Sequence, residues 1–104
     1  MVASLRTAKV KLVTVIVPYE RVEAFEKDLR HLGIRGYTSM TADGQGHHGP
    51  RTSGLFDSAN VRFEILARPH DAAGVLGLVD GKYADEAVVA YATDVEAVPA
   101  TRFE

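Results

Sequence analysis

The order of hydrophobic patterns along the chain limits its possible folds more than any other feature. A strand-like, a helix-like and a second strand-like pattern follow one another in residues 9–42, and the same order returns in residues 60–93. A glycine-rich segment lies between these two halves. Because 104 residues are the length of one ordinary domain, residues 1–104 are predicted to form a single α+β domain.

The first half predicts a central strand, a helix and a more polar strand. Lys9–Pro18 is rich in β-branched residues and apolar on both faces, which is typical of a strand covered on both sides. Apolar residues spaced by three or four positions predict a helix over Tyr19–Leu32, with Gly33 as its left-handed C-cap. Gly36–Ala42 is mildly polar, which favours a strand at a sheet edge or an interface.

The second half repeats this order with clearer alternation. Asn60–Ala67 alternates apolar and polar residues, which predicts a strand with one buried face. Pro69 then begins a helix at a position where its missing N–H costs little. Gly74 and Gly77 weaken that helix, so we expect tight packing against the sheet at both positions. Ala87–Thr93 is the last predicted strand.

Two split strand–helix–strand units in succession predict the ferredoxin-like βαββαβ arrangement. Right-handed crossovers would place both helices on one face of the sheet. The other face then carries Val13, Val15 and Val17, or the residues that alternate with them, and the chain has nothing left to cover it. We therefore expect a homo-oligomer of closed symmetry that packs sheet against sheet.

Composition and charge exclude several classes of protein. The formal net charge of −2 provides no basic field, which disfavours nucleic acid as a partner. No apolar run approaches the roughly 18 residues that span a bilayer. The absence of cysteine excludes disulfides, thiolate ligands and thiol nucleophiles, and it fits a cytoplasmic protein.

The segment between the halves is long for a connection that only turns the chain, which needs two to five residues. Glycine N–H groups at residues 44–54 can converge on an oxyanion, and Arg51 can add a bidentate clamp. A solvated loop without a ligand fits the same residues equally well. His47 and His48 are adjacent and point apart in an extended loop, which disfavours a shared metal ion.

No other residues form a recognisable catalytic arrangement. The string Asp80-Gly81-Lys82 predicts a surface turn after the second helix, with contact between Lys82 and a ligand phosphate as the alternative. The carboxylates are scattered, and no buried pair is marked for acid–base chemistry. The residues therefore favour a ligand-binding module over an enzyme.

Four motifs in order give the chain a family resemblance. They are Gly33-Ile34-Arg35-Gly36-Tyr37-Thr38, Gly44-Gln45-Gly46, Arg51-Thr52-Ser53-Gly54 and Asn60-Val61-Arg62-Phe63-Glu64-Ile65-Leu66. With them the chain resembles the PII-like signalling proteins, and in particular the subgroup associated with carboxysomes and bicarbonate transport. The resemblance implies a homotrimer with three clefts between subunits, each binding an adenine nucleotide of the AMP, ADP or cyclic AMP class.

The resemblance also implies a mode of action without catalysis or a cofactor. The segment at about residues 43–59 would be the T-loop, which moves with ligand and contacts partners. Bicarbonate would bind near this loop, and the partner would be a bicarbonate transporter or a carboxysome component. The protein would be cytoplasmic, associated with the carboxysome or recruited to a membrane transporter.

The resemblance assigns ligand-binding roles to individual positions. Gly36 and Thr38 would lie by the adenine or ribose, Gly44–His47 would present N–H groups to phosphate, and Arg102 would reach a neighbouring subunit's phosphate. The full nucleotide-binding set is Gly36, Tyr37, Thr38, Gly44, Gln45, Gly46, His47, Arg51, Phe63 in the cleft wall, Val88, Val89, Ala90 and Arg102. The set for bicarbonate or another anion at the T-loop is Gly46, His48 and Arg51.

Two other functions fit the same fold class. A CutA-like trimer would bind a divalent metal, and a metal titration of a variant lacking His47 and His48 would distinguish it. A small ferredoxin-like isomerase or monooxygenase would need a catalytic histidine or acid in a pocket on the sheet face. That face is predicted to be apolar.

Replacing Arg51 with Ala tests the predicted anion clamp. If the guanidinium donates charged hydrogen bonds to phosphate, nucleotide binding should weaken by roughly 1.5–3 kcal/mol. Calorimetric titration of both proteins with ADP measures this difference. An unchanged affinity would remove Arg51 from the site.

Overall fold

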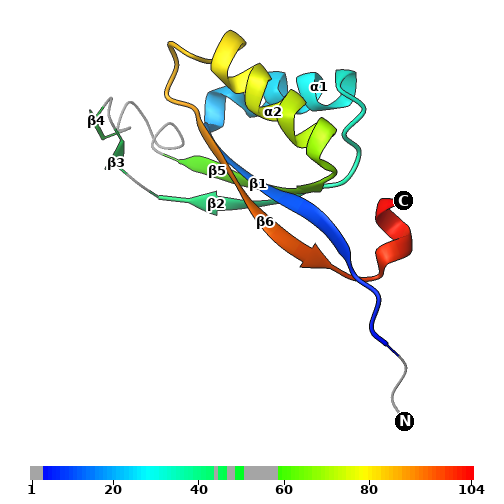
Figure 1. Cartoon of the computed structure of the whole chain (residues 1–104). Helices are drawn as coiled ribbons and strands as arrows, with labels where there is room; N and C mark the ends of the chain where they lie inside the picture. Colours follow the sequence, from blue (N-terminus) through cyan, green and yellow to red (C-terminus); the bar gives the residue numbers. More distant parts are fainter. Residues whose placement is uncertain (1–3, 44, 47–48, 51–58) are drawn as a thin grey trace.

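The protein is a two-layer α+β domain, seen here in a computed structural model that describes residues 4–43, 45–46, 49–50 and 59–104. A four-stranded antiparallel sheet forms one layer, with the strand order β2-β5-β1-β6 (Figure 1). The strands of this sheet are β1 Ala8–Pro18, β2 Thr38–Ala42, β5 Asn60–Ala67 and β6 Val89–Ala97. This is the predicted ferredoxin-like strand order, with the mildly polar β2 at an edge.

Two helices form the second layer, and both cover the same face of the sheet (Figure 1). Short 3₁₀ turns precede the first helix and follow the last strand. The helical elements are η1 Tyr19–Arg21, α1 Val22–His31, α2 Pro69–Lys82 and η2 Ala100–Phe103. The placement of both helices on one face confirms the expectation from right-handed crossovers.

The strand β1 is central, and its two faces have different surroundings. It pairs with β5 on one side and with β6 on the other. Val13, Val15 and Val17 have no exposed surface and belong to the core cluster between the sheet and the helices. The alternating residues, including Leu12 and Ile16, therefore point to the other face. Of the two sets predicted for the uncovered face, the alternating one is correct.

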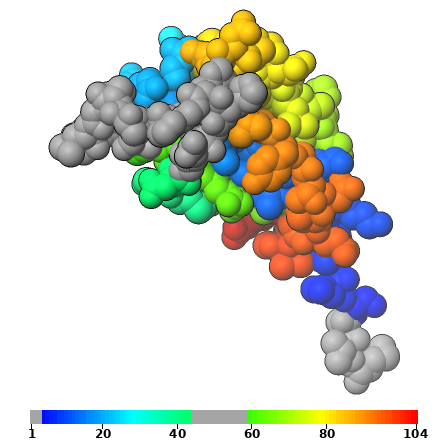
Figure 2. All heavy atoms as spheres, turned by 90° about the vertical axis from the view of Figure 1, so that its left-hand side faces the viewer, coloured from blue at the N-terminus to red at the C-terminus, as the bar shows by residue number. Residues whose placement is uncertain are grey.

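The uncovered side, called the open face below, carries large apolar side chains from all four strands. Strand register places them together on one face, and most of them are exposed. They are Leu12, Ile16, Met40, Leu66, Val89 and Tyr91. The strand β6 lies open along one side of the molecule (orange in Figure 2). Exposed apolar patches of this kind mark interaction surfaces.

The helix α1 ends in the predicted glycine cap. Gly33 has a φ of +82°, and its N–H donates to the carbonyl of Arg30 over 3.0 Å. The N–H of Ile34 donates to the carbonyl of Leu29 over 2.9 Å, which completes a Schellman motif. Leu29 and Ile34 are both buried, so the cap also fixes the chain that leads to β2.

Several element boundaries differ from the sequence-based prediction, among them the end of α2 and both ends of β6. Asp80-Gly81-Lys82 forms the last turn of α2 and is not a surface turn. The helix continues because Lys82 and Tyr83, at its end, bind Asp28 on α1. The last strand runs over Val89–Ala97 because β6 pairs with β1 as far as the Ala8–Ala97 partners.

The expected tight packing at the two helix glycines is wrong. A Cβ added at Gly74 would meet only the Cδ2 atom of Leu32, at an ordinary contact distance of 3.9 Å. A Cβ added at Gly77 would meet nothing within 4 Å. Neither glycine is therefore required by close approach to the sheet.

The segment between β2 and β5 is described only in part. Gln45–Gly46 (β3) and Gly49–Pro50 (β4) pair as a short antiparallel ladder. Residues 44, 47–48 and 51–58 of the predicted T-loop, Arg51 among them, lie outside the described residues.

Replacing Gly77 with Ala should stabilise the protein. The site has room for the methyl group, and alanine gains about 1 kcal/mol over glycine inside a helix. Urea unfolding measures the difference. The matched variant Gly33→Ala should lose stability, because its positive φ is strained for any residue with a Cβ. A lower stability of Gly77→Ala than of the unchanged protein would contradict the open space at that position.

Candidate functional site

A hollow of about 490 Å³ opens where the chain enters β2. It lies on the open face, and four separate parts of the chain contribute to it: β1, the start of β2, β5 and η2. Its lining residues are Leu12, Gly36, Tyr37, Thr38, Glu64, Leu66 and Phe103. Its walls are mainly apolar, and Thr38 and Glu64 bring a hydroxyl and a carboxylate to them. It is called the base hollow below.

The backbone of β5 offers further polar groups beside this hollow. The pairing of β2 with β5 begins at Thr38 opposite Glu64, whereas β5 continues to Ala67. Among the described residues, no strand pairs with β5 beyond Glu64 on the β2 side. Backbone N–H and C=O groups at a strand edge without a partner can bind the edge of a ligand.

Tyr37 is held firmly beside the base hollow. Its hydroxyl donates to Oε2 of Glu26 on α1 over 2.5 Å, and its ring lies 5.2 Å from the ring of Phe63. The hydrogen bond to Glu26, together with burial, raises the pKa of Tyr37 above its usual value. The side chain therefore stays a neutral hydrogen-bond donor and links α1 to the entry of β2.

Glu64 brings a negative charge to the base hollow. Its Oε2 atom lies 3.1 Å from Nη2 of Arg62, and the two side chains remain about one third exposed. This surface ion pair contributes little to stability. The carboxylate remains able to accept hydrogen bonds from a ligand.

A second hollow of about 360 Å³ adjoins the first and has a different charge character. The two share Gly36, Leu66 and Phe103 in their walls. The second hollow, called the arginine hollow below, carries three arginines and two carboxylates. Its full lining is Gly33, Ile34, Arg35, Gly36, Ile65, Leu66, Ala67, Arg68, Asp71, Arg102, Phe103 and Glu104.

The structure brings some predicted site residues together and separates others. Gly36, Tyr37 and Thr38 all line the base hollow. Val88–Ala90 lie at the start of β6, which is the sheet edge opposite to β2. Arg102 lines the arginine hollow of its own chain. Within one chain, therefore, the predicted residues of the last strand do not reach the base hollow.

Phe63 has a different position from the one the resemblance implies. Its side chain has no exposed surface and packs on Phe25 of α1, with 5.0 Å between ring centroids. Inside one chain it supports Tyr37 from the core and does not form part of a surface.

The remaining predicted ligand contacts fall in the T-loop. Gln45 and Gly46 form β3, where their backbone belongs to the β3–β4 ladder. Gly44, His47, His48 and Arg51 lie outside the described residues.

Sequence reasoning missed four residues of the base hollow: Leu12, Glu64, Leu66 and Phe103. The sequence could have indicated the first three, because strand alternation places them on the face turned away from the helices. Phe103 had none, since its position depends on how η2 returns to the sheet.

A second polar cluster joins the two helices at the end of α2. Nζ of Lys82 lies 2.9 Å and 3.1 Å from the two carboxylate oxygens of Asp28, and the Tyr83 hydroxyl donates to the same group over 2.6 Å. Arg21 forms a two-point ion pair with Glu86, at 2.9 Å in both contacts. Lys82 is thus occupied by Asp28, which disfavours its suggested contact with a ligand phosphate.

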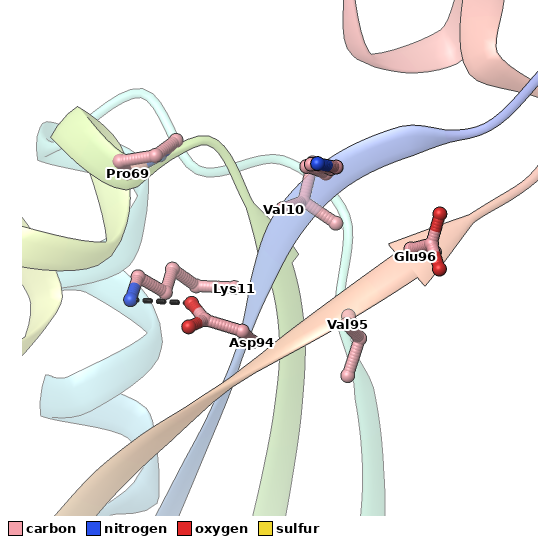
Figure 3. A pocket seen from close by; sticks show the side chains of 7 residues that line it. Val10, Lys11, Pro69, Asp94, Val95 and Glu96 are labelled. Carbon is pink, nitrogen blue, oxygen red and sulfur yellow. Dashed lines mark ion pairs between the residues drawn. The ribbon is translucent and has the colours of Figure 1, made fainter.

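Another hollow, of about 680 Å³, lies near the start of α2, and none of the predicted site residues lines it (Figure 3). Nζ of Lys11 lies 2.5 Å from Oδ1 of Asp94, and Lys9 and Glu96 add one charge of each sign. The positive and negative charges of this hollow therefore balance.

Over the described residues, no group of three or more histidine, cysteine or acidic side chains is arranged to hold a metal ion.

One family model matches most of the chain. The sequence model of the family described as Nitrogen regulatory protein P-II matches residues 10–102. No match was found among curated protein sequences. Among the described residues, no helix has the length and apolar character needed to cross a membrane.

Solved structures share the fold over nearly the whole chain. A PII-like signalling protein from Thermus thermophilus is 26% identical, with a TM-score of 0.78 over 94% of this chain and 98% of that one. CPII from Thiomonas intermedia, a nitrogen regulatory PII-like protein bound to ADP, AMP and bicarbonate, is 17% identical. Its TM-score is 0.82 over 96% of this chain and 98% of that one. The structure of CPII bound to ADP and bicarbonate gives a TM-score of 0.82 at 19% identity, over 97% and 100% of the two chains.

Replacing Asp28 with Asn should destabilise the protein in a pH-dependent way. Burial alone would raise the pKa of Asp28, but hydrogen bonds from Tyr83 and Lys82 outweigh it and lower the pKa below 3.8. The carboxylate therefore stabilises the fold above about pH 4, and this contribution is lost as the pH falls through the folded-state pKa.

Urea unfolding of both proteins from pH 7 to pH 2.5 measures this contribution. We expect the free energy of unfolding of Asp28→Asn to be about 1–2 kcal/mol lower than that of the unchanged protein at pH 7. This difference should shrink below about pH 4. The control Tyr83→Phe keeps the buried ring and removes one hydrogen bond, so its deficit should be smaller. A deficit that is constant with pH would contradict the account.

Proposed function

The chain belongs to the nitrogen regulatory protein P-II family, and we propose that this PII-like signalling protein binds an adenine nucleotide of the AMP, ADP or cyclic AMP class without catalysing a reaction. The single observation that carries the proposal is the base hollow, in which Gly36, Tyr37 and Thr38 meet two other strands. The related CPII was solved with ADP and AMP bound, which supports the same ligand class here.

The base hollow suits a nucleobase in size and chemistry. Its volume of about 490 Å³ falls within the range of small-molecule sites. Leu12 and Leu66 provide apolar surface for the flat faces of a base. The hydroxyl of Thr38, the carboxylate of Glu64 and the unpaired edge of β5 provide hydrogen-bonding groups for its polar edge.

The phosphates would lie towards the T-loop, which begins after β2. Backbone N–H groups at Gly44–His47 would bind them, and Arg51 would add a charged clamp. Bicarbonate would bind near Gly46, His48 and Arg51. CPII was also solved with bicarbonate, which supports this second ligand.

A homotrimer explains how the separated residues form one site. The open face bears exposed apolar side chains, including Leu66, Val89 and Tyr91, that a neighbouring subunit would cover. Val88–Ala90 lie at the sheet edge opposite to β2, so they can reach a base hollow only across a subunit boundary. Arg102 would likewise contact the phosphate of a neighbouring site.

Ligand binding would act through the T-loop at residues 43–59. A ligand that binds one loop conformation more tightly shifts the population towards it, and the loop then presents a different surface to a partner. We propose a role in inorganic-carbon metabolism, in the cytoplasm or at the carboxysome, with a bicarbonate transporter or a carboxysome component as the partner.

Isothermal titration of the full chain with AMP, ADP, ATP, cyclic AMP and bicarbonate tests the proposal. We expect saturable binding of at least one adenine nucleotide. The variant Gly36→Leu should weaken this binding at least about tenfold, because Gly36 lines both hollows and a leucine there adds bulk to their shared wall. Nothing lies within 4 Å of a Cβ at Gly36, so the fold should be kept.

The matched control is Gly81→Leu, at another open position outside both hollows. It should bind nucleotides like the unchanged protein, and circular dichroism should show the same secondary structure for both variants. If no adenine nucleotide releases or absorbs heat, the proposed function is wrong. If Gly36→Leu binds normally, the ligand does not occupy the base hollow.

A further inference from the structure

Phe103 lines the candidate site, although neither the sequence motifs nor the predicted ferredoxin-like fold indicated this. Its side chain is half-buried and lines both the base hollow and the arginine hollow. The element that carries it, η2, turns back after β6 and contacts β1 (red in Figure 1). An aromatic ring from the end of the chain therefore forms part of the wall between two hollows.

The surroundings of Phe103 form an apolar slot on the open face. Leu12 and Leu66 are directly paired across β1 and β5, so their side chains lie next to each other on this face. Phe103 lines the same hollow but comes from a separate element. A flat ligand that enters the hollow would thus touch aliphatic surface of the sheet and the ring of η2.

The element η2 packs on the domain without using the ring itself. Ala100 is buried, and the N–H of Arg102 donates to the carbonyl of Pro99 over 3.1 Å. Glu104 forms an ion pair with Arg6. Burial of Ala100 anchors the start of η2, so the ring of Phe103 lies in the wall of the hollow before a ligand arrives.

We propose that Phe103 is a specificity-determining residue, whose ring stacks on the nucleobase and makes the site prefer nucleotides over sugar phosphates. The inference rests on the proposed function and adds a residue to it. Every base has a π-face, so stacking on an aromatic ring contributes to affinity and depends on the base alone. Ligands without a base gain nothing from this contact.

Affinities for AMP and for ribose 5-phosphate test the role of the ring. These two ligands share sugar and phosphate and differ by the base. Phe103→Ala should weaken AMP binding by about tenfold and leave ribose 5-phosphate binding unchanged. Phe103→Leu keeps an apolar side chain without a π-face, so AMP binding should weaken nearly as much. AMP affinity within about twofold of the unchanged protein in both variants would overturn the inference.

A fluorescent variant gives a second readout that a merely structural role would not change. The chain contains no tryptophan, so Phe103→Trp introduces a single fluorophore at the slot. Stacking should quench its emission on titration with AMP, and ribose 5-phosphate should leave it unchanged. The matched control Leu5→Trp places the fluorophore at an exposed position outside both hollows and should respond to neither ligand.

The outcomes separate this inference from the proposed function. If the unchanged protein binds AMP while Phe103→Ala binds it equally well and Phe103→Trp shows no quenching, the role of Phe103 is wrong and the proposed function stands. If the unchanged protein binds no adenine nucleotide, both are wrong. Circular dichroism of each variant shows whether a lost affinity comes from a lost fold.

Discussion

The packing of Phe25 against Phe63 joins α1 to the sheet. The positions of Tyr37 and Tyr83, which hydrogen-bond to α1, depend on this contact. The two rings lie 5.0 Å apart and are completely buried. Tyr37 packs on the far side of Phe63, and Tyr83 packs on Phe25 at 5.9 Å. Each outer ring is buried on its apolar side and ends in a hydroxyl that reaches a carboxylate of α1. One row of aromatic contacts therefore fixes the entry of β2 and the end of α2 against the same helix.

This arrangement supports the proposed ligand site on the less covered side of the sheet. The helices bury one face of the sheet, and the resulting core keeps β1 and β5 in register beneath the base hollow. The ligand side needs only groups that the core has already positioned: Thr38 at the start of β2, Glu64 on β5, and backbone beyond the end of strand pairing. Pre-positioned groups lower the entropy cost of binding.

Much of the fold was predictable because its signals are local. The β-branched run of β1, the glycine cap at Gly33 and the alternation in β5 each follow from a few neighbouring residues. The end of α2 was not predictable from local sequence, since a tertiary contact with Asp28 extends the helix past Gly81. The glycines of α2 were misread because poor helix propensity alone does not reveal whether a site is crowded.

The candidate site was predictable only where motif and fold coincide. Gly36–Thr38 belong to a motif and also line the base hollow. Leu12 and Leu66 belong to the site through strand register, and Phe103 through the return of η2, which no local pattern encodes. Phe63 was predicted in the cleft wall from its motif, whereas its side chain is buried in the core.

A crystal structure of the protein with AMP tests the central claim most directly. The account predicts that the adenine lies in the base hollow against Leu12 and Leu66, with its polar edge towards Thr38, Glu64 and the unpaired edge of β5. It also predicts that the phosphate points towards residues 44–47. Adenine density at any other place on the protein, with the base hollow left to solvent, would contradict the account.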